Sequence, residues 1–216
     1  MSHVAPDSII LFDFDGVVAD SLDVFFNEFT AVCADMGFDR LNSRETFLRL
    51  FETNLLAGLV KAGFPVWKLK KLVRAFAPRI AEANARVPPF DGMPGILNRL
   101  AARFPLYFIT SNTSAAILAF TEHHAIDGFR DVLGADKEPS KVKKIRQVRA
   151  AHPGAAAYYV GDTKGDMIEA REAGATAVAA AWGWHPVEKL REGAPDVLLR
   201  EPADLLAFFG LAADAP

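Results

Sequence analysis

Two aspartates separated by one residue follow an apolar run near the start of the chain. Asp13 and Asp15 come directly after residues 9–12, and Gly16 follows them. A carboxylate can attack phosphorus and form an aspartyl-phosphate. A second carboxylate beside it can give a proton to the leaving oxygen and then take one from water. A bare Asp-x-Asp is more often a helix cap and a solvated turn, so this interpretation depends on the rest of the chain.

A second pair of acids lies near the C-terminal third of the sequence. Asp162 ends another apolar run, and Asp166 follows four residues later, with Gly161 and Gly165 beside them. Carboxylates at a turn from strand to helix are hard oxygen ligands, and Mg²⁺ is commonly bound by one or two of them together with a substrate phosphate. An acid in the first helical turn is also favoured by the helix dipole, which is the alternative for Asp166.

A cation is expected near these four acids, because clustered carboxylates repel each other and would otherwise hold protons at neutral pH. Lys141 is the predicted candidate, in the first turn of a helix for which Ser140 is a suitable N-cap. Lys137 is the rival. Lys143 and Lys144 are expected to be solvated.

Three polar residues end a further apolar run. Thr110, Ser111 and Asn112 offer hydroxyl and amide donors at the predicted start of a helix, and such a place binds phosphate oxygens well. They are therefore candidate phosphate ligands. The same residue types are also the preferred ordinary N-caps.

The elements that must position these residues alternate along the chain. Continuous apolar runs, typical of strands buried on both faces, cover residues 9–12, 106–109, 156–160, 175–181 and 197–199. Helical patterns cover residues 94–103, 115–123, 140–151, 166–173 and 202–209. This alternation predicts an α/β fold with a Rossmann-like, doubly wound parallel sheet. Asp13, Thr110 and Asp162 then follow the carboxyl ends of strands, where ligands bind in such sheets.

One segment breaks the alternation. Residues 21–86 show helical periodicity and no convincing strand, and Pro78 is expected to break or kink the third of the helices there. We therefore predict an inserted, all-helical cap at residues 20–87, and a catalytic core formed by residues 1–19 and 88–216. The cap would lie over the end of the first strand.

Composition excludes several classes of partner. The chain has 216 residues, a net charge of -3 and one cysteine, Cys33. Lys and Arg are dispersed, so neither a nucleic-acid surface nor a membrane surface is predicted, and no intrachain disulfide is possible. No signal peptide is evident in residues 1–8. We expect a soluble cytoplasmic protein, either a monomer or a homodimer.

Taken together and in this order, the motifs resemble those of the haloacid dehalogenase superfamily. Residues 13–21 resemble its first motif, residues 108–112 the second, Lys141 the third and residues 160–166 the fourth. Residues 181–185 are similar to members related to phosphoglycolate phosphatase. The resemblance extends over about residues 8 to 200, including a helical cap between the first two motifs.

The resemblance implies a Mg²⁺-dependent phosphohydrolase that acts on a small-molecule phosphate ester. Asp13 would be the nucleophile and Asp15 the acid and base. Thr110 and Lys141 would hold the phosphoryl oxygens, with Ser111 and Asn112 beside them.

The resemblance also implies how Mg²⁺ is held. Asp162 would ligate the ion, and Asp166 would ligate it or position it. Asp13 would share the ion, and Asp15 would contribute its backbone carbonyl.

One departure keeps a second activity open. Val17 stands where most phosphatases of the family have threonine, and valine there also occurs in related hexose-phosphate mutases. A phosphomutase acting on a hexose phosphate is therefore the alternative enzyme. The alternative outside enzymes is a phospho-acceptor signalling domain, which also uses an aspartate, a hydroxyl, a lysine and Mg²⁺.

Overall fold

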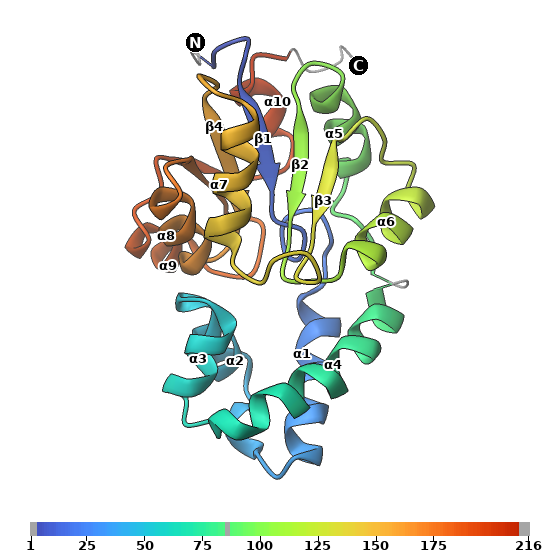
Figure 1. Cartoon of the computed structure of the whole chain (residues 1–216), viewed down its shortest axis with the longest axis vertical. Helices are drawn as coiled ribbons and strands as arrows, with labels where there is room; N and C mark the ends of the chain where they lie inside the picture. The colour runs from blue at the N-terminus through green and yellow to red at the C-terminus, as the bar shows by residue number, and fades with distance from the viewer. Residues whose placement is uncertain (1–3, 85–86, 212–216) are drawn as a thin grey trace.

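The protein has an α/β core and a helical lobe (Figure 1). The structure is a computed structural model, and it describes residues 4–84 and 87–211. The core sheet has six parallel strands in the order β3-β2-β1-β4-β5-β6. The strands are β1 Ile9–Phe12, β2 Leu106–Ile109, β3 Asp131–Leu133, β4 Ala157–Gly161, β5 Thr176–Ala180 and β6 Val197–Leu199. The predicted fold class is thereby confirmed.

Helices cover both faces of the sheet. They are α5 Met93–Ala101, α6 Ser114–His123, α7 Lys141–Ala151, α8 Lys164–Glu172, α9 Val187–Glu192 and α10 Asp204–Phe208. Ile10 and Phe12 face one apolar cluster, with α5, α6 and α10, and Ile9 and Leu11 face the other, with α7, α8 and α9. Successive strand residues point to opposite faces, which is why the run at 9–12 is apolar throughout.

The helical lobe consists of α1 Leu22–Asp35, α2 Arg44–Leu48, α3 Leu55–Lys61 and α4 Leu69–Asn84. Three short 3₁₀ helices, Asp39–Leu41, Arg49–Glu52 and Val66–Lys68, join them. Of the predicted break or kink at Pro78, the break is wrong, because α4 continues through this residue, and the kink stays a prediction. The predicted cap boundary at residue 87 follows residues 85–86, which lie outside the described residues, so the division at 20–87 stays a prediction.

The lobe lies beyond the carboxyl ends of the strands (Figure 1). It contacts the core through the segment before α3. The carbonyl of Thr53 packs on Gly165 at the start of α8 so closely that any Cβ on Gly165 would overlap with it. His185 Nε2 lies 2.9 Å from the Leu48 carbonyl, and Lys189 pairs with Glu52 at 3.2 Å. The lobe and the core are therefore in direct contact at the start of α8 and at α9.

The pattern of the sequence missed two core elements and misplaced several ends. Strand β3 has three residues, and only two of them are apolar and buried, so it is too short to stand out from a loop. Helix α9 has six residues and follows a segment rich in Gly and Trp. Among the described residues, no helix is both long enough and apolar enough to cross a membrane.

Candidate active site

Three aspartates from two strand ends meet at the carboxyl edge of the sheet. One carboxylate oxygen from each of Asp13, Asp162 and Asp166 lies within 4.8 Å of the others. Asp13 follows β1, Asp162 follows β4, and Asp166 lies in the first turn of α8. All three side chains are buried. The neighbouring positions of β1 and β4 in the sheet bring together acids that lie about 150 residues apart.

Lys141 joins two of these carboxylates. Its Nζ donates to Asp13 Oδ2 and to Asp166 Oδ1, each at 2.7 Å. The rival candidate Lys137 is bound elsewhere, to the Asp131 carboxylate and the Val132 carbonyl. The structure thus places Lys141, and not Lys137, among the acids.

Asp166 is held in place by the turn that begins α8. Thr163 is the N-cap, and its backbone N–H and hydroxyl donate to Asp166 Oδ2 at 3.0 and 2.6 Å. The Tyr159 hydroxyl donates to Asp166 Oδ1 at 3.2 Å. Burial alone would raise the pKa of Asp166, but Lys141 and the two Thr163 donors outweigh it and lower this pKa below its ordinary value. The residue is therefore both a helix-start acid and a member of the cluster.

Asp162 is held at one oxygen and free at the other. Oδ2 accepts the Trp184 backbone N–H at 2.7 Å, whereas Oδ1 is buried and has no hydrogen-bond partner among the described residues. Gly16, with φ of 77°, lies so close that a Cβ there would overlap with Asp162 Oδ2. The glycine is needed for this approach as well as for its positive φ.

The three carboxylates fit a divalent metal ion. A buried carboxylate oxygen without a partner is costly, and Mg²⁺ prefers oxygen ligands of this kind. Burial first, and then the neighbouring acids, raise the pKa of Asp162 well above its ordinary range. Burial, opposed by Lys141, raises the pKa of Asp13 to about 7. A bound cation would offset both effects and keep the acids ionised.

Asp15 lies beside the cluster but is not part of it. Its Oδ1 is buried without a hydrogen-bond partner among the described residues. Burial raises its pKa to about 6, and the nearby Ser21, Lys141 and Asn112 side chains reduce this shift. A carboxyl group with such a pKa can hold a proton near neutral pH and exchange it, as an acid and base must.

Of the three predicted phosphate ligands, only one lines the cavity. Ser111 lines the cavity above the acids. Thr110 and Asn112 are buried next to it, and Thr110 Oγ1 accepts the Asn112 N–H at 3.0 Å. Their role as phosphate ligands stays a prediction.

Lys144 is the clearest error of the sequence interpretation. It is fully buried rather than solvated, and its Nζ donates to the Thr110 carbonyl at 2.6 Å. Burial, together with the charge of Lys141, lowers the pKa of Lys144 to about 8. Residues three apart lie on one side of a helix, so the spacing of Lys141 and Lys144 was the signal that could have indicated this.

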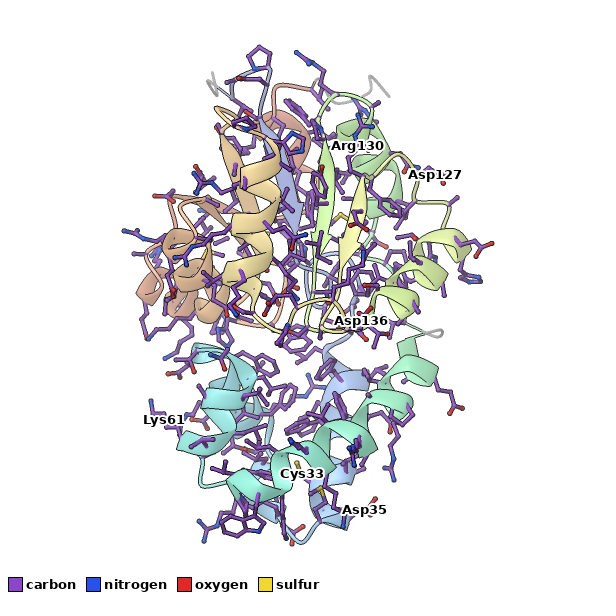
Figure 2. The ribbon with its side chains drawn as sticks, viewed as in Figure 1. Cys33, Asp35, Lys61, Asp127, Arg130 and Asp136 are labelled. Carbon is purple, nitrogen blue, oxygen red and sulfur yellow. The ribbon has the colours of Figure 1, made fainter. Side chains whose placement is uncertain are left out.

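The acids open into a cavity of about 80 Å³ between the core and the lobe. Asp136, at the end of the sheet that faces the lobe, marks this level in Figure 2, and Asp127 and Arg130 lie toward the opposite end. The lobe contributes mostly apolar walls. The cap residues lining the cavity are Phe25, Phe51, Thr53, Asn54 and Leu55.

Trp184 connects the two parts of the site. Its backbone N–H holds Asp162, while its ring lies 4.9 Å from that of Phe51 and 5.2 Å from that of Phe25. The segment 181–185 stood out in the sequence only through its resemblance to other proteins. Glu169 also lines the cavity, and nothing in the sequence predicted this. It follows Asp166 by one helical turn, but only the orientation of α8 shows that both side chains face the cavity.

The chain matches the family described as haloacid dehalogenase-like hydrolase over residues 10–180. It belongs to this family. The expected family resemblance is thereby confirmed, and so is the interpretation of the chain as an enzyme rather than a signalling domain.

Similar proteins extend along nearly the whole chain. A phosphoglycolate phosphatase of Synechococcus elongatus is 29% identical over 201 residues, which cover 91% of this chain and 94% of that protein. A phosphoglycolate phosphatase of Chromobacterium violaceum is 25% identical, with 81% and 85% covered. A haloacid dehalogenase-like hydrolase family protein from Streptococcus pneumoniae has a solved structure with a TM-score of 0.78 and 25% identity, covering 94% of this chain and 98% of that one.

Proposed function

We propose that the protein is a Mg²⁺-dependent phosphatase that hydrolyses a small phosphorylated metabolite through an aspartyl-phosphate on Asp13. The observation that carries the proposal is the convergence of Asp13, Asp162 and Asp166. Lys141 joins two of these acids, and one Asp162 oxygen has no partner among the described residues. The phosphatases among the similar proteins support the same activity.

In the first half-reaction, an Asp13 carboxylate oxygen forms a bond to phosphorus, and the bond from phosphorus to the ester oxygen breaks. The Asp15 carboxyl group gives its proton to the departing oxygen, which leaves as an alcohol. Lys141 offsets charge on the phosphoryl oxygens, which is where the transition state of phosphoryl transfer needs stabilisation.

In the second half-reaction, Asp15, now ionised, takes a proton from water as the water oxygen attacks phosphorus. The bond from phosphorus to Asp13 breaks, and inorganic phosphate leaves. Asp13, Asp162 and Asp166, with the Asp15 carbonyl, would hold Mg²⁺, which supplies charge stabilisation to the phosphoryl group when bound. Thr110, Ser111 and Asn112 would bind phosphoryl oxygens.

Phosphate release from a panel of phosphorylated metabolites, with and without Mg²⁺, tests this function. We expect release that requires the ion and is lost after chelation. A phosphorylated isomer in place of free phosphate would show a phosphomutase, the alternative left by Val17, which is buried and whose carbonyl accepts the Trp182 indole N–H.

The intermediate can be tested with Asp15→Asn and p-nitrophenyl phosphate. The p-nitrophenolate leaves without protonation, so Asp13 should still be phosphorylated, but water is no longer activated. We expect intact-mass measurement to show a phosphorylated chain that accumulates in this variant and not in the unmodified protein. A variant that turns over at the full rate would contradict the role of Asp15. A cytoplasmic location, and a monomer or homodimer, stay predictions.

A further inference from the structure

The charge of the cavity restricts what can be attached to the phosphate. Among the described residues that line it, Lys141 is the one cation, and it already pairs with Asp13 and Asp166. The other ionisable groups that line the cavity, the catalytic acids and Glu169, are all carboxyl groups. A second anionic group on a substrate would therefore find no free cation here.

Glu169 is the acid that the proposed reaction does not use. It lies one turn beyond Asp166 on α8 and lines the cavity. Its side chain is partly exposed, and no ion pair or hydrogen bond of its carboxylate occurs among the described residues. An unpaired carboxylate at the cavity repels an anion and attracts a cation.

Among the described residues that line the cavity from the cap side, none is a cation that could compensate. The large side chains on this side are Phe25, Phe51 and Leu55, and Trp184 extends this apolar wall from the core. Aromatic faces attract ammonium groups and tolerate neutral alkyl groups. They offer a carboxylate neither a hydrogen bond nor a positive charge to compensate for its lost hydration.

The other cations of α7 do not line this cavity: Lys144 donates to the Thr110 carbonyl, and two more line a neighbouring cavity. Lys143 and Arg146 line a neighbouring space on the other side of Glu169. Each already faces a glutamate at 3.8 Å, Lys143 facing Glu138 and Arg146 facing Glu172. The cavity over the acids is also small, about 80 Å³, which suits a leaving group of a few atoms.

We propose that the enzyme selects phosphate esters of short alcohols that carry an ammonium group, accepts neutral ones less well, and discriminates against those with a carboxylate. Glu169 and the aromatic wall provide the selection. This inference rests on the proposed phosphatase function, and it separates the chain from the phosphoglycolate phosphatases that it resembles, because phosphoglycolate carries a carboxylate on its leaving group.

Three probes of matched length test the selection: phosphoethanolamine, ethyl phosphate and 2-phosphoglycolate. We expect kcat/KM to fall in that order, with about a tenfold or larger difference between the first and the last. Assays at roughly pH 8.5 keep Glu169 ionised, since burial raises its pKa to about 7.

The three alcohols differ in leaving ability, so the decisive quantity is the change in their ratio on substitution. Glu169→Gln should reduce the preference for phosphoethanolamine over phosphoglycolate by about tenfold. Glu172→Gln is the matched control. It removes the same charge three residues further along α8, from a side chain that lines the neighbouring cavity only, and should leave the ratio unchanged.

Each other result counts against a particular claim. A preference for phosphoglycolate in the unmodified enzyme, or an unchanged ratio in Glu169→Gln, overturns the inference and leaves the phosphatase function intact. Hydrolysis of other metabolites but of none of the three probes does the same. No phosphate release from any ester overturns the proposed function itself.

Discussion

The two walls of the cavity have opposite characters. The core wall contains buried carboxylates and Lys141. Short hydrogen bonds hold Asp13, Asp162, Asp166 and Lys141 in place. The cap wall is built of aromatic rings that pack on one another, such as Phe51 with Phe47 at 5.2 Å and with Trp184 at 4.9 Å.

This difference indicates a division of labour. Every phosphate ester presents the same phosphoryl group, so the groups that act on it need fixed positions and charges, which the rigid sheet edge provides. Esters differ in what is attached, and the cap wall contacts that part. Changes in the groups that act on the phosphoryl group should therefore affect all substrates alike, whereas changes in the cap wall and at Glu169 should alter the ratio between substrates.

The largest effect is expected for Asp13→Asn, which removes the nucleophile at almost constant shape. Turnover should fall by about 10⁴-fold or more for every substrate, measured as phosphate release. The folded structure should persist for two reasons. Burial disfavours the charged form of Asp13, so a neutral side chain is tolerated there, and Lys141 still pairs with Asp166. Thermal unfolding of the variant is the control. Full activity would show that the nucleophile lies elsewhere.

The two buried lysines of α7 provide a comparison within the core wall. Lys141→Met leaves two carboxylates without their cation, and kcat should fall by about 10²- to 10³-fold. Lys144→Met removes a bond to the Thr110 carbonyl only, so its loss of kcat should be smaller, about tenfold. Steady-state kinetics on one substrate measures both. An effect of Lys144→Met equal to that of Lys141→Met would place Lys144 among the phosphate ligands.

A smaller and substrate-dependent effect is expected from the cap wall. Phe51→Leu removes an aromatic face from the cavity, and kcat/KM should change by about tenfold for some esters and little for others. Phe38→Leu is the matched control, since Phe38 packs on Phe64 inside the cap and does not line the cavity. An equal decrease of kcat/KM for all substrates in Phe51→Leu would contradict the division of roles between the two walls.

The smallest effect concerns stability and pH. Burial, the largest influence on each, raises the pKa of Asp13 and Asp15 from 3.8 to about 7 and about 6. Between pH 3.8 and these raised values, the two carboxyl groups therefore hold more protons in the folded chain than in the unfolded chain. Their contribution to stability is fully present below pH 3.8 and is lost as the pH rises through 6 and 7. Asp166, with a lowered pKa, titrates below this window.

Without metal, Tm should therefore fall by a few degrees as the pH rises from about 5 to about 8, since 1 kcal/mol corresponds to roughly 2–4 °C in a chain of this length. Mg²⁺ should restore Tm more at the higher pH, because protons and metal compete for the same carboxylates. Calorimetry with and without Mg²⁺ measures both. Equal stabilisation by Mg²⁺ at the two pH values would contradict a site made of these acids.

Asp13 and Asp162 of the core wall could be predicted because each follows an apolar run. Such runs are strands, and parallel strands place their carboxyl ends at one edge, so Asp13 and Asp162 were expected to meet. Strand β3 could not be predicted in this way, because it contributes only Val132 and Leu133 to the core. The helix does not break at Pro78, because packing of α4 against α1 outweighs the local cost of proline.

The amino-acid sequence by itself determined the kind of sheet, the order of its motifs and the acids at its edge, since these depend on local periodicity and on residue type. Only the tertiary structure decided which side chains of α7, α8 and the cap face those acids, because that depends on how the helices are rotated and docked. Lys144 and Glu169 show this most clearly. Both are ordinary charged residues of a helix in sequence. Packing buries Lys144 beneath Thr110 and leaves Glu169 at the cavity without an ion pair among the described residues.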